Sequence, residues 1–177
     1  MYYAFINKDK INGVGQVRIS GKDIINSEIS QDVYEELITD IRKYIWNGSK
    51  VVINNNYQSL LDQEERDRLD SLIITRSDFF DGIIKAFGLN DKDILPIVQQ
   101  LITTTTEDLT LQKVAINHFT NAKDFYRCHE LFKLLSDRPI KVSDEVTLTI
   151  TSDQWDRFFD KASKIETKEN AYKELLT

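Results

Sequence analysis

Three residues in the second half of the chain are of types that bind metal ions: His118, Cys128 and His129. Imidazole nitrogen and thiolate sulfur are the ligands that zinc prefers. Their spacing matches no zinc-binding pattern, and adjacent side chains rarely point at one ion. We therefore expect no metal site. Instead, we interpret His118 as bordering a helix face and Cys128 as a small buried apolar residue.

Paired carboxylates are a second feature that can support chemistry, because two acids in different environments can act as general acid and general base. Such pairs are plentiful in the chain. They include Glu35-Glu36, Glu64-Glu65 and Asp153 with Asp156. Because all of these lie on the polar faces of expected helices, solvation explains them. We expect no catalytic residue.

The Gly13-Val14-Gly15 segment contains two of the six glycines of the chain. A dinucleotide-binding loop with closely spaced glycines joins a strand to a helix. Here the glycines fall within an expected hairpin, where Asn12-Gly13 and Gly15 would supply the positive φ angles of a turn or bulge. The sequence therefore predicts a turn and no cofactor site.

Large aromatic and cationic side chains are the remaining candidates for function. Arg127 and His129 flank the expected junction of two helices, where they would either bind an anion or cap the helix end. Aromatic residues either pack in the core or form a contact surface; the relevant ones are Tyr2, Tyr3, Trp46, Tyr57 and Trp155. The candidate partner-binding residues are Tyr2, Trp46, Tyr57, Arg127 and His129.

The composition is that of an ordinary globular protein. The 177 residues are 41% hydrophobic and 29% charged, with only two prolines, which argues against a disordered or fibrous chain. A net charge of −6 gives the whole molecule no long-range attraction for nucleic acid. The single cysteine excludes an intramolecular disulfide. The apolar N-terminal run ends at Asn7, so we expect a soluble intracellular protein without a signal peptide or membrane partner.

Residues 1–58 are predicted to form a small β-rich unit. The segments 2–6 and 14–19 are rich in aromatic and β-branched residues and predict a meander, to which 24–29 adds a third strand. Ser30 is a good N-cap for a helix over 31–41. Residues 44–46 and 51–53 flank an Asn-Gly pair, the strongest short hairpin signal.

Residues 59–74 are predicted to form a charged helical spacer. Between Asp62 and Asp70 only Leu69 is apolar. Asp62 with Arg66, and Glu64 with Arg68, have the acid-before-base i,i+4 spacing that stabilises a helix by about 0.2–0.5 kcal/mol per pair. A helix that is polar almost all round is typical of a solvent-exposed connection between two bodies. A weak oligomer contact through its few leucines is the alternative.

Residues 75–177 are predicted to form a mainly helical domain. Thr75 caps a first helix that ends at Gly88, and a turn follows at Asn90 or Asp91. The second helix contains Pro96 early and ends near residue 102, since Thr103–Thr106 favour a loop. Apolar spacing predicts a long helix over 111–126, then a short one over 129–136.

The last part of the chain is predicted to contain a small hairpin and a closing helix. Residues 140–142 and 146–150 alternate in polarity around Ser143-Asp144-Glu145. Ser152 is the expected cap of a strong amphipathic helix. We expect the charged tail from Glu166 to Thr177 to extend this helix and fray. The predicted fold class is α+β.

Several segments resemble small proteins encoded among the tail genes of phages and prophages. The matching segments are Tyr2–Ile6, Ile11–Gln16, Ile29–Tyr34, Tyr44–Gly48, Asn54–Tyr57 and Thr75–Phe79, followed by Ala122, Phe125, Arg127, His129, Leu131 and Trp155–Ala162. The chain departs from this pattern at 103–109 and 139–150, which look like insertions. The shared positions are turns, caps and core residues.

This resemblance implies a non-enzymatic phage protein that belongs to the tail or baseplate or assists its assembly. Its partner would be another phage tail protein, and it would act in the host cytoplasm. The resemblance does not decide whether the protein is incorporated into the virion or whether it self-associates. The alternative is an acidic inhibitor of a host defence protein, whose carboxylates would occupy a basic nucleic-acid channel.

Overall fold

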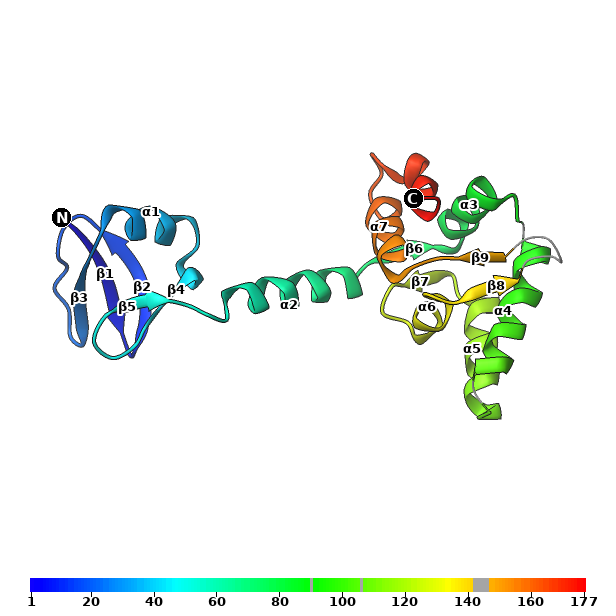
Figure 1. Cartoon of the computed structure of the whole chain (residues 1–177), viewed down its shortest axis with the longest axis horizontal. Coiled ribbons are helices and arrows are strands. Elements are labelled where there is room, and N and C mark those ends of the chain that lie inside the picture. Colours follow the sequence, from blue (N-terminus) through cyan, green and yellow to red (C-terminus); the bar gives the residue numbers. More distant parts are fainter. Residues whose placement is uncertain (90, 106, 142–146) are drawn as a thin grey trace. The chain divides into compact units, whose positions relative to one another are not determined.

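The structure is a computed structural model that describes residues 1–89, 91–105, 107–141 and 147–177. It has an α+β fold, which confirms the predicted class. The chain divides into two compact units, Met1–Glu64 and Glu65–Thr177, and the division falls inside helix α2 (Tyr57–Asp70) (Figure 1). The three-part division into 1–58, 59–74 and 75–177 stays a prediction.

A three-stranded antiparallel sheet forms the base of the N-terminal unit. Strand β1 (Tyr2–Asn7) is central, between β2 (Lys10–Gly15) and β3 (Ile24–Ile29), so the predicted meander and its third strand are confirmed. Ala4 and Ile6 alternate onto one face and are 0% and 1% exposed. Helix α1 (Gln31–Thr39) lies against this sheet (Figure 1).

The hairpin turn between β1 and β2 does not lie at the glycines. Lys8 and Asp9 form it with φ angles of 49° and 61°, whereas Asn12 lies in β2 beside a shift in the register with β1. Gly15 is small because a Cβ there would lie 2.7 Å from Cζ of Phe5. The positive φ angles predicted for the glycines of this segment were therefore wrong, and Gly15 instead leaves room for the ring of Phe5.

The rest of the N-terminal unit follows the sequence signals. Ser30 caps α1 by accepting a hydrogen bond from the backbone N of Val33 at 3.3 Å. A short 3-10 helix, η1 (Ile41–Lys43), leads into the predicted hairpin of β4 (Tyr44–Trp46) and β5 (Val51–Ile53). Gly48 has the expected positive φ, 93°.

Helix α2 is polar as predicted, and it buries none of its residues. The predicted Glu64–Arg68 pair is wrong. Within the N-terminal unit Glu64 binds Arg42, and within the C-terminal unit Arg68 binds Glu65 and Asp160. Arg42 and Asp160 from other elements, and Glu65 three positions before Arg68, replace the i,i+4 partner, because an exposed pair of that kind is worth only a few tenths of a kcal/mol.

The C-terminal unit is built around an aromatic core. Helix α3 (Arg76–Phe87) is capped by Thr75 and ends at Gly88 with φ 70°, as predicted. It places Phe79 at the centre of the core. The rings of six residues lie within 6.4 Å of it, measured between centroids: Phe80, Phe119, Phe125, Phe132, Trp155 and Phe158.

A two-stranded pairing replaces the end of the predicted long helix. Helix α5 (Leu109–Asn121) ends before Phe125, which lies in β7 (Asp124–Tyr126) and pairs with β6 (Ile73–Thr75). The helix predicted to reach residue 126 was therefore wrong, and β6 was not predicted. A three-residue strand carries too little periodicity to be recognised without its partner.

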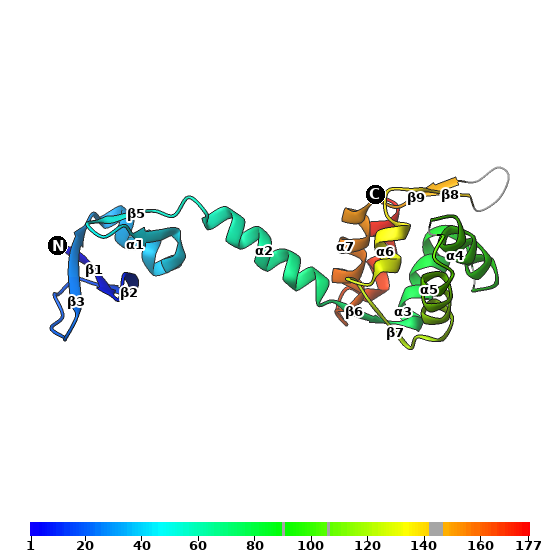
Figure 2. The ribbon, with the colours of Figure 1, turned by 90° about the horizontal axis from the view of Figure 1, so that it is seen from below.

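Helix α4 (Asp91–Thr105) packs beside α5 (Figure 2). It continues past residue 102, so the predicted loop over Thr103–Thr105 was wrong. Thr103 and Thr104 fit in the helix because each Oγ1 donates to the carbonyl of Gln100 at 2.9 Å. The predictions made for residues 90, 106 and 142–146 lie outside the described residues.

The remaining elements are α6 (Glu130–Leu135), the hairpin strands β8 (Pro139–Lys141) and β9 (Thr147–Thr149), and α7 (Ser152–Ala162). The short helix and the hairpin strands were predicted. Thr151, one residue before the predicted cap, caps α7 and forms a capping box with Gln154.

The charged tail does not extend α7 or fray, contrary to the prediction. It forms a second 3-10 helix, η2 (Lys168–Leu175), which packs against α7 and α3. Ala171 and Leu175 hold it there, at 1% and 3% exposure. Glu174 also forms ion pairs with Arg157 and Lys161 of α7, so apolar burial and ion pairs together hold the charged tail.

Candidate partner-binding surfaces

An open groove on the N-terminal unit has a volume of about 450 Å³. It is lined by the start of β2, by η1 and β4, and by the first turn of α2. Its apolar lining includes Ile11, Ile41, Ile45, Trp46 and Leu60, and its charged residues are Asp9, Lys10 and Arg42. Ile45 and Leu60 are 46% and 43% exposed, so the groove presents apolar surface to solvent.

A polar network fixes one wall of this groove. The guanidinium of Arg42 lies 2.8 Å from Oδ2 of Asp40 and also binds Glu64. Tyr57 donates its hydroxyl to the same Asp40 oxygen at 3.0 Å, and Asn54 donates its side-chain amide to the carbonyl of Arg42 at 2.9 Å. Five residues from the α1–η1 junction, η1, the β5–α2 connection and α2 therefore hold one another in place.

The network also shifts the ionisation of its members. The hydrogen bond from Arg42 holds the pKa of the Asp40 carboxyl well below its usual range. Burial, and then the hydrogen bond to Asp40, raise the pKa of the Tyr57 hydroxyl. Asp40 therefore remains charged, and Tyr57 remains a neutral donor, across the physiological pH range.

The structure brings two of the three predicted N-terminal residues to this region. Trp46 lines the groove and packs against the core of the unit, while Tyr57 belongs to the supporting network. Tyr2 does not line the groove; its ring packs on Tyr34, with centroids 4.5 Å apart. Ile45 was not singled out, because a continuous apolar strand such as β4 ordinarily indicates burial and not exposure.

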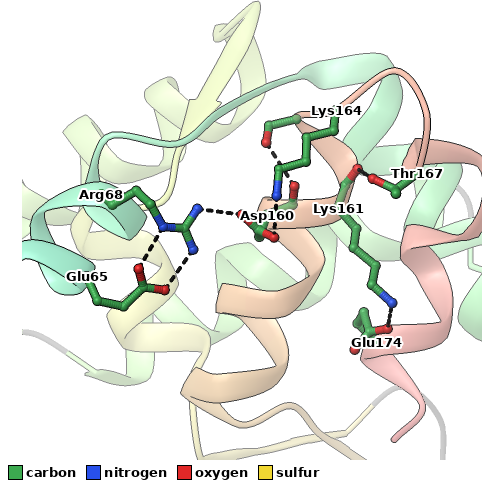
Figure 3. A network of polar contacts seen from close by, with 8 residues as sticks. Glu65, Arg68, Asp160, Lys161, Lys164, Thr167 and Glu174 are labelled. Carbon is green, nitrogen blue, oxygen red and sulfur yellow. Dashed lines mark hydrogen bonds and ion pairs between the residues drawn. The ribbon is translucent and has the colours of Figure 1, made fainter. Parts of the chain in front are cut away.

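A charged groove of about 360 Å³ lies between the end of α2 and α7 in the C-terminal unit. Arg68 contacts Glu65 at 2.7 Å and Asp160 at 2.5 Å, and Lys164 contacts Asp160 at 2.7 Å. Farther along α7, Lys161 binds Glu174 of η2 (Figure 3). These ion pairs tie α2, α7 and η2 together.

The carboxyl groups of this network have lowered pKa values and are therefore charged at neutral pH. Burial raises the pKa of Asp160, but Lys164 and Arg68 outweigh it and hold the pKa below its usual value. Arg68 likewise lowers the pKa of Glu65, and Lys161 lowers that of Glu174. Each acid is matched by a base, as expected of a network that stabilises the unit.

We expect this network to contribute only modestly to stability. The Arg68 side chain is 43% exposed, and exposed ion pairs contribute about 0–1 kcal/mol. Arg68→Ala should therefore lower the free energy of unfolding by about 1 kcal/mol or less, and the loss should shrink in high salt. Urea unfolding at low and high salt measures this. Lys173→Ala, at an exposed lysine of η2, is the control; a large loss in Arg68→Ala that salt does not change would contradict the expectation.

Arg127 is buried, with 6% exposure. Its Nη2 donates to Oγ and to the carbonyl oxygen of Ser152 at 2.8 and 3.2 Å, and its Nε lies 2.6 Å from Oδ1 of Asp156. Burial raises the pKa of the Asp156 carboxyl, and Arg127 offsets part of that rise. Arg127 therefore links the segment after β7 to the first turns of α7.

His129 caps helix α6. Its Nδ1 accepts a hydrogen bond from the backbone N of Leu131 at 3.1 Å, and its ring stacks on His118, with centroids 3.8 Å apart and planes 6° apart. The neighbouring Cys128 is exposed, so the prediction that it is buried was wrong. Among the described residues, no three His, Cys, Asp or Glu side chains are grouped to hold a metal ion.

Comparison with known protein families, curated proteins and solved structures found no match for this chain. Within the described ranges, no helix has both the length and the apolar character needed to cross a membrane.

Proposed function

We propose that this chain is a non-enzymatic protein-binding module and that a partner docks in the groove of the N-terminal unit. The observation that carries the proposal is the apolar lining of the groove, in which Ile45 and Leu60 are exposed beside the partly buried Trp46. An apolar centre surrounded by charged residues is the usual anatomy of a protein interface. Trp and Arg are also the residues most often found at binding hot spots.

The groove is preformed, which favours binding. The hydrogen bonds among Asp40, Arg42, Asn54 and Tyr57 fix its wall before a partner arrives. A partner therefore does not have to order these long side chains, each of which would otherwise cost about 0.5–1.5 kcal/mol on binding.

We further propose that the partner is a phage tail or baseplate protein. The chain acts in tail assembly in the host cytoplasm, and it either leaves after assembly or is retained in the virion. The support is the sequence resemblance described above. In this role the N-terminal groove holds the partner, while the aromatic core of the C-terminal unit gives that unit a stable body of its own.

The surface charges favour this role over inhibition of host defence. An inhibitor that mimics nucleic acid must present unpaired carboxylates in place of phosphates. Here carboxylates on both units are engaged by bases, as in the pairs Asp40–Arg42, Glu65–Arg68 and Glu174–Lys161. Mutual neutralisation of this kind weakens attraction to a basic channel.

Affinity capture of the tagged full-length chain from infected cells, followed by mass spectrometry, tests the proposal. We expect a tail or baseplate protein to be captured and the chain to be found in particles or in assembly intermediates. Capture of a host nuclease would support the inhibitor alternative. Absence of the chain from both particles and intermediates would contradict a role in tail assembly.

A further inference from the structure

Two stacked histidines connect α5 to the start of α6. The rings of His118 and His129 lie parallel at 3.8 Å, and the edge of Phe125 faces His118 at 6.4 Å between centroids. Nε2 of His118 is buried, and it has no hydrogen-bond partner among the described residues. Both rings are half-buried, so neither is fully solvated.

The hydrogen bond at the helix start defines the protonation state of His129. An Nδ1 that accepts from the Leu131 amide carries no proton, so the neutral ring has its proton on Nε2. Protonation of Nδ1 would turn this acceptor into a donor facing another donor. It would also place a positive charge at the N-terminal end of α6, where the helix dipole disfavours it.

The surroundings of His129 oppose its protonation further. Burial, followed by the neighbouring His118, lowers the pKa of the His129 imidazole below its ordinary value of 6.5. Glu130 acts in the opposite direction, but its carboxylate is engaged by Lys133 at 2.8 Å. Within the described part of the chain, the titratable groups that act on the ring are His118 from α5 and Glu130 from the first turn of α6.

We infer that His118 and His129 form a proton-sensitive switch, in which protonation of His129 breaks the N-cap of α6 and loosens the start of that helix. Leu131 and Phe132 lie in the first turn of α6 and are both 0% exposed, so a loosened first turn disturbs the aromatic core. This regulation lies in the C-terminal unit and does not depend on the proposed docking groove.

The sign of the effect follows from the lowered pKa. The folded unit binds fewer protons than the unfolded chain, so the stabilising contribution is complete above about pH 6.5 and is lost as pH falls below that value. Asp160 and Glu65 of the charged groove have ordinary pKa values of 3.8 and 4.5, which the fold lowers further. Their contribution is lost only at more acidic pH, which separates the two effects.

Nuclear magnetic resonance of the full-length chain tests the switch directly, because the chain contains only two histidines. We expect the His129 ring to titrate below pH 6.5. The Leu131 amide should shift with the same midpoint and lose at least about tenfold of its hydrogen-exchange protection as the ring is protonated. A His129 midpoint at or above the ordinary value, or a Leu131 amide that does not respond, would overturn the inference.

Two variants separate the switch from a purely structural role. His129→Asn keeps a good capping acceptor that does not titrate, so the Leu131 amide should become insensitive to pH between about 7 and 5. His118→Phe keeps a ring on the stack but removes the neighbouring imidazole that lowers the pKa of His129, so the His129 midpoint should rise. A Leu131 response that persists in His129→Asn, or a His129 midpoint unchanged in His118→Phe, counts against the switch.

Discussion

Replacing Arg127 with alanine is expected to lower the free energy of unfolding of the C-terminal unit by about 3–5 kcal/mol. The guanidinium is buried against Asp156 and Ser152. Its removal leaves Asp156, which is only 25% exposed, without the cation that compensates its charge. It also removes a link between β7 and α7, which both contribute to the aromatic core.

Urea unfolding followed by tryptophan fluorescence measures this effect. Trp46→Phe leaves Trp155 as the only tryptophan, and that side chain is 1% exposed in the core of the C-terminal unit. Arg157→Ala is the matched control, because Arg157 is 44% exposed and forms an ion pair with Glu174; we expect a loss of about 1 kcal/mol or less. Equal losses in the two variants would contradict the structural role of Arg127.

A double replacement tests whether the unpaired charge is the cause. Arg127→Met combined with Asp156→Leu removes both charges and substitutes apolar side chains. Since replacing a whole buried pair is often close to neutral, the double variant should be clearly more stable than Arg127→Ala. If the double variant loses as much free energy of unfolding as Arg127→Ala, the cause is lost packing or the lost hydrogen bonds to Ser152, and not the unpaired charge of Asp156.

Leu37→Ala is expected to lower the free energy of unfolding of the N-terminal unit by about 2–5 kcal/mol, a large part of its total. Leu37 is the one buried residue of α1, at 3% exposure, and it joins Ala4 and Ile6 in a small core. Removing a buried leucine side chain costs about 2–5 kcal/mol. A unit of this size has about 3–10 kcal/mol of stability in total, at about 0.05–0.15 kcal/mol per residue.

The neighbouring isoleucine provides the control for this variant. Ile38 is 61% exposed on the same helix, so Ile38→Ala should change stability by about 0.5 kcal/mol or less. In a Trp155→Phe background the fluorescence of Trp46 reports on the N-terminal unit alone. Similar losses in Leu37→Ala and Ile38→Ala would show that α1 does not dock through Leu37.

Local signals in the sequence predicted much of the fold. Ser30 and Thr75 cap helices as their side-chain oxygens allow, and Gly48 and Gly88 adopt the positive φ angles that glycine tolerates. The apolar spacing around Trp155 placed α7 correctly in the core. These signals are reliable because each acts within a few residues of the position that it determines.

Pairings between distant segments were not predictable. Phe125 has the spacing of a helical core residue, but its backbone pairs with Ile74, about fifty positions earlier. The same holds for Leu175, whose burial against α7 orders the charged tail. In both places tertiary packing outweighs local preference.

The candidate site was predictable only in part. Trp46 and Tyr57 were selected by residue type, and the structure places both at the groove or its wall. The groove forms where β2, β4 and α2 come together, and the sequence of any one of these segments does not predict that arrangement. Arg127 was selected for its charge, whereas its burial depends on Asp156 in a distant helix.

The most direct test of the account compares partner capture by two variants of the full-length chain. Ile45→Lys puts a charge on the exposed apolar lining of the groove, and Ile38→Lys puts the same charge on exposed α1, outside the groove lining. Circular dichroism verifies that both variants fold. We expect Ile45→Lys to bind the captured partner at least about 30-fold more weakly, which corresponds to a hot spot worth about 2 kcal/mol. Ile38→Lys should bind the partner as tightly as the unmodified chain does. Equal binding by both variants would contradict docking in the groove.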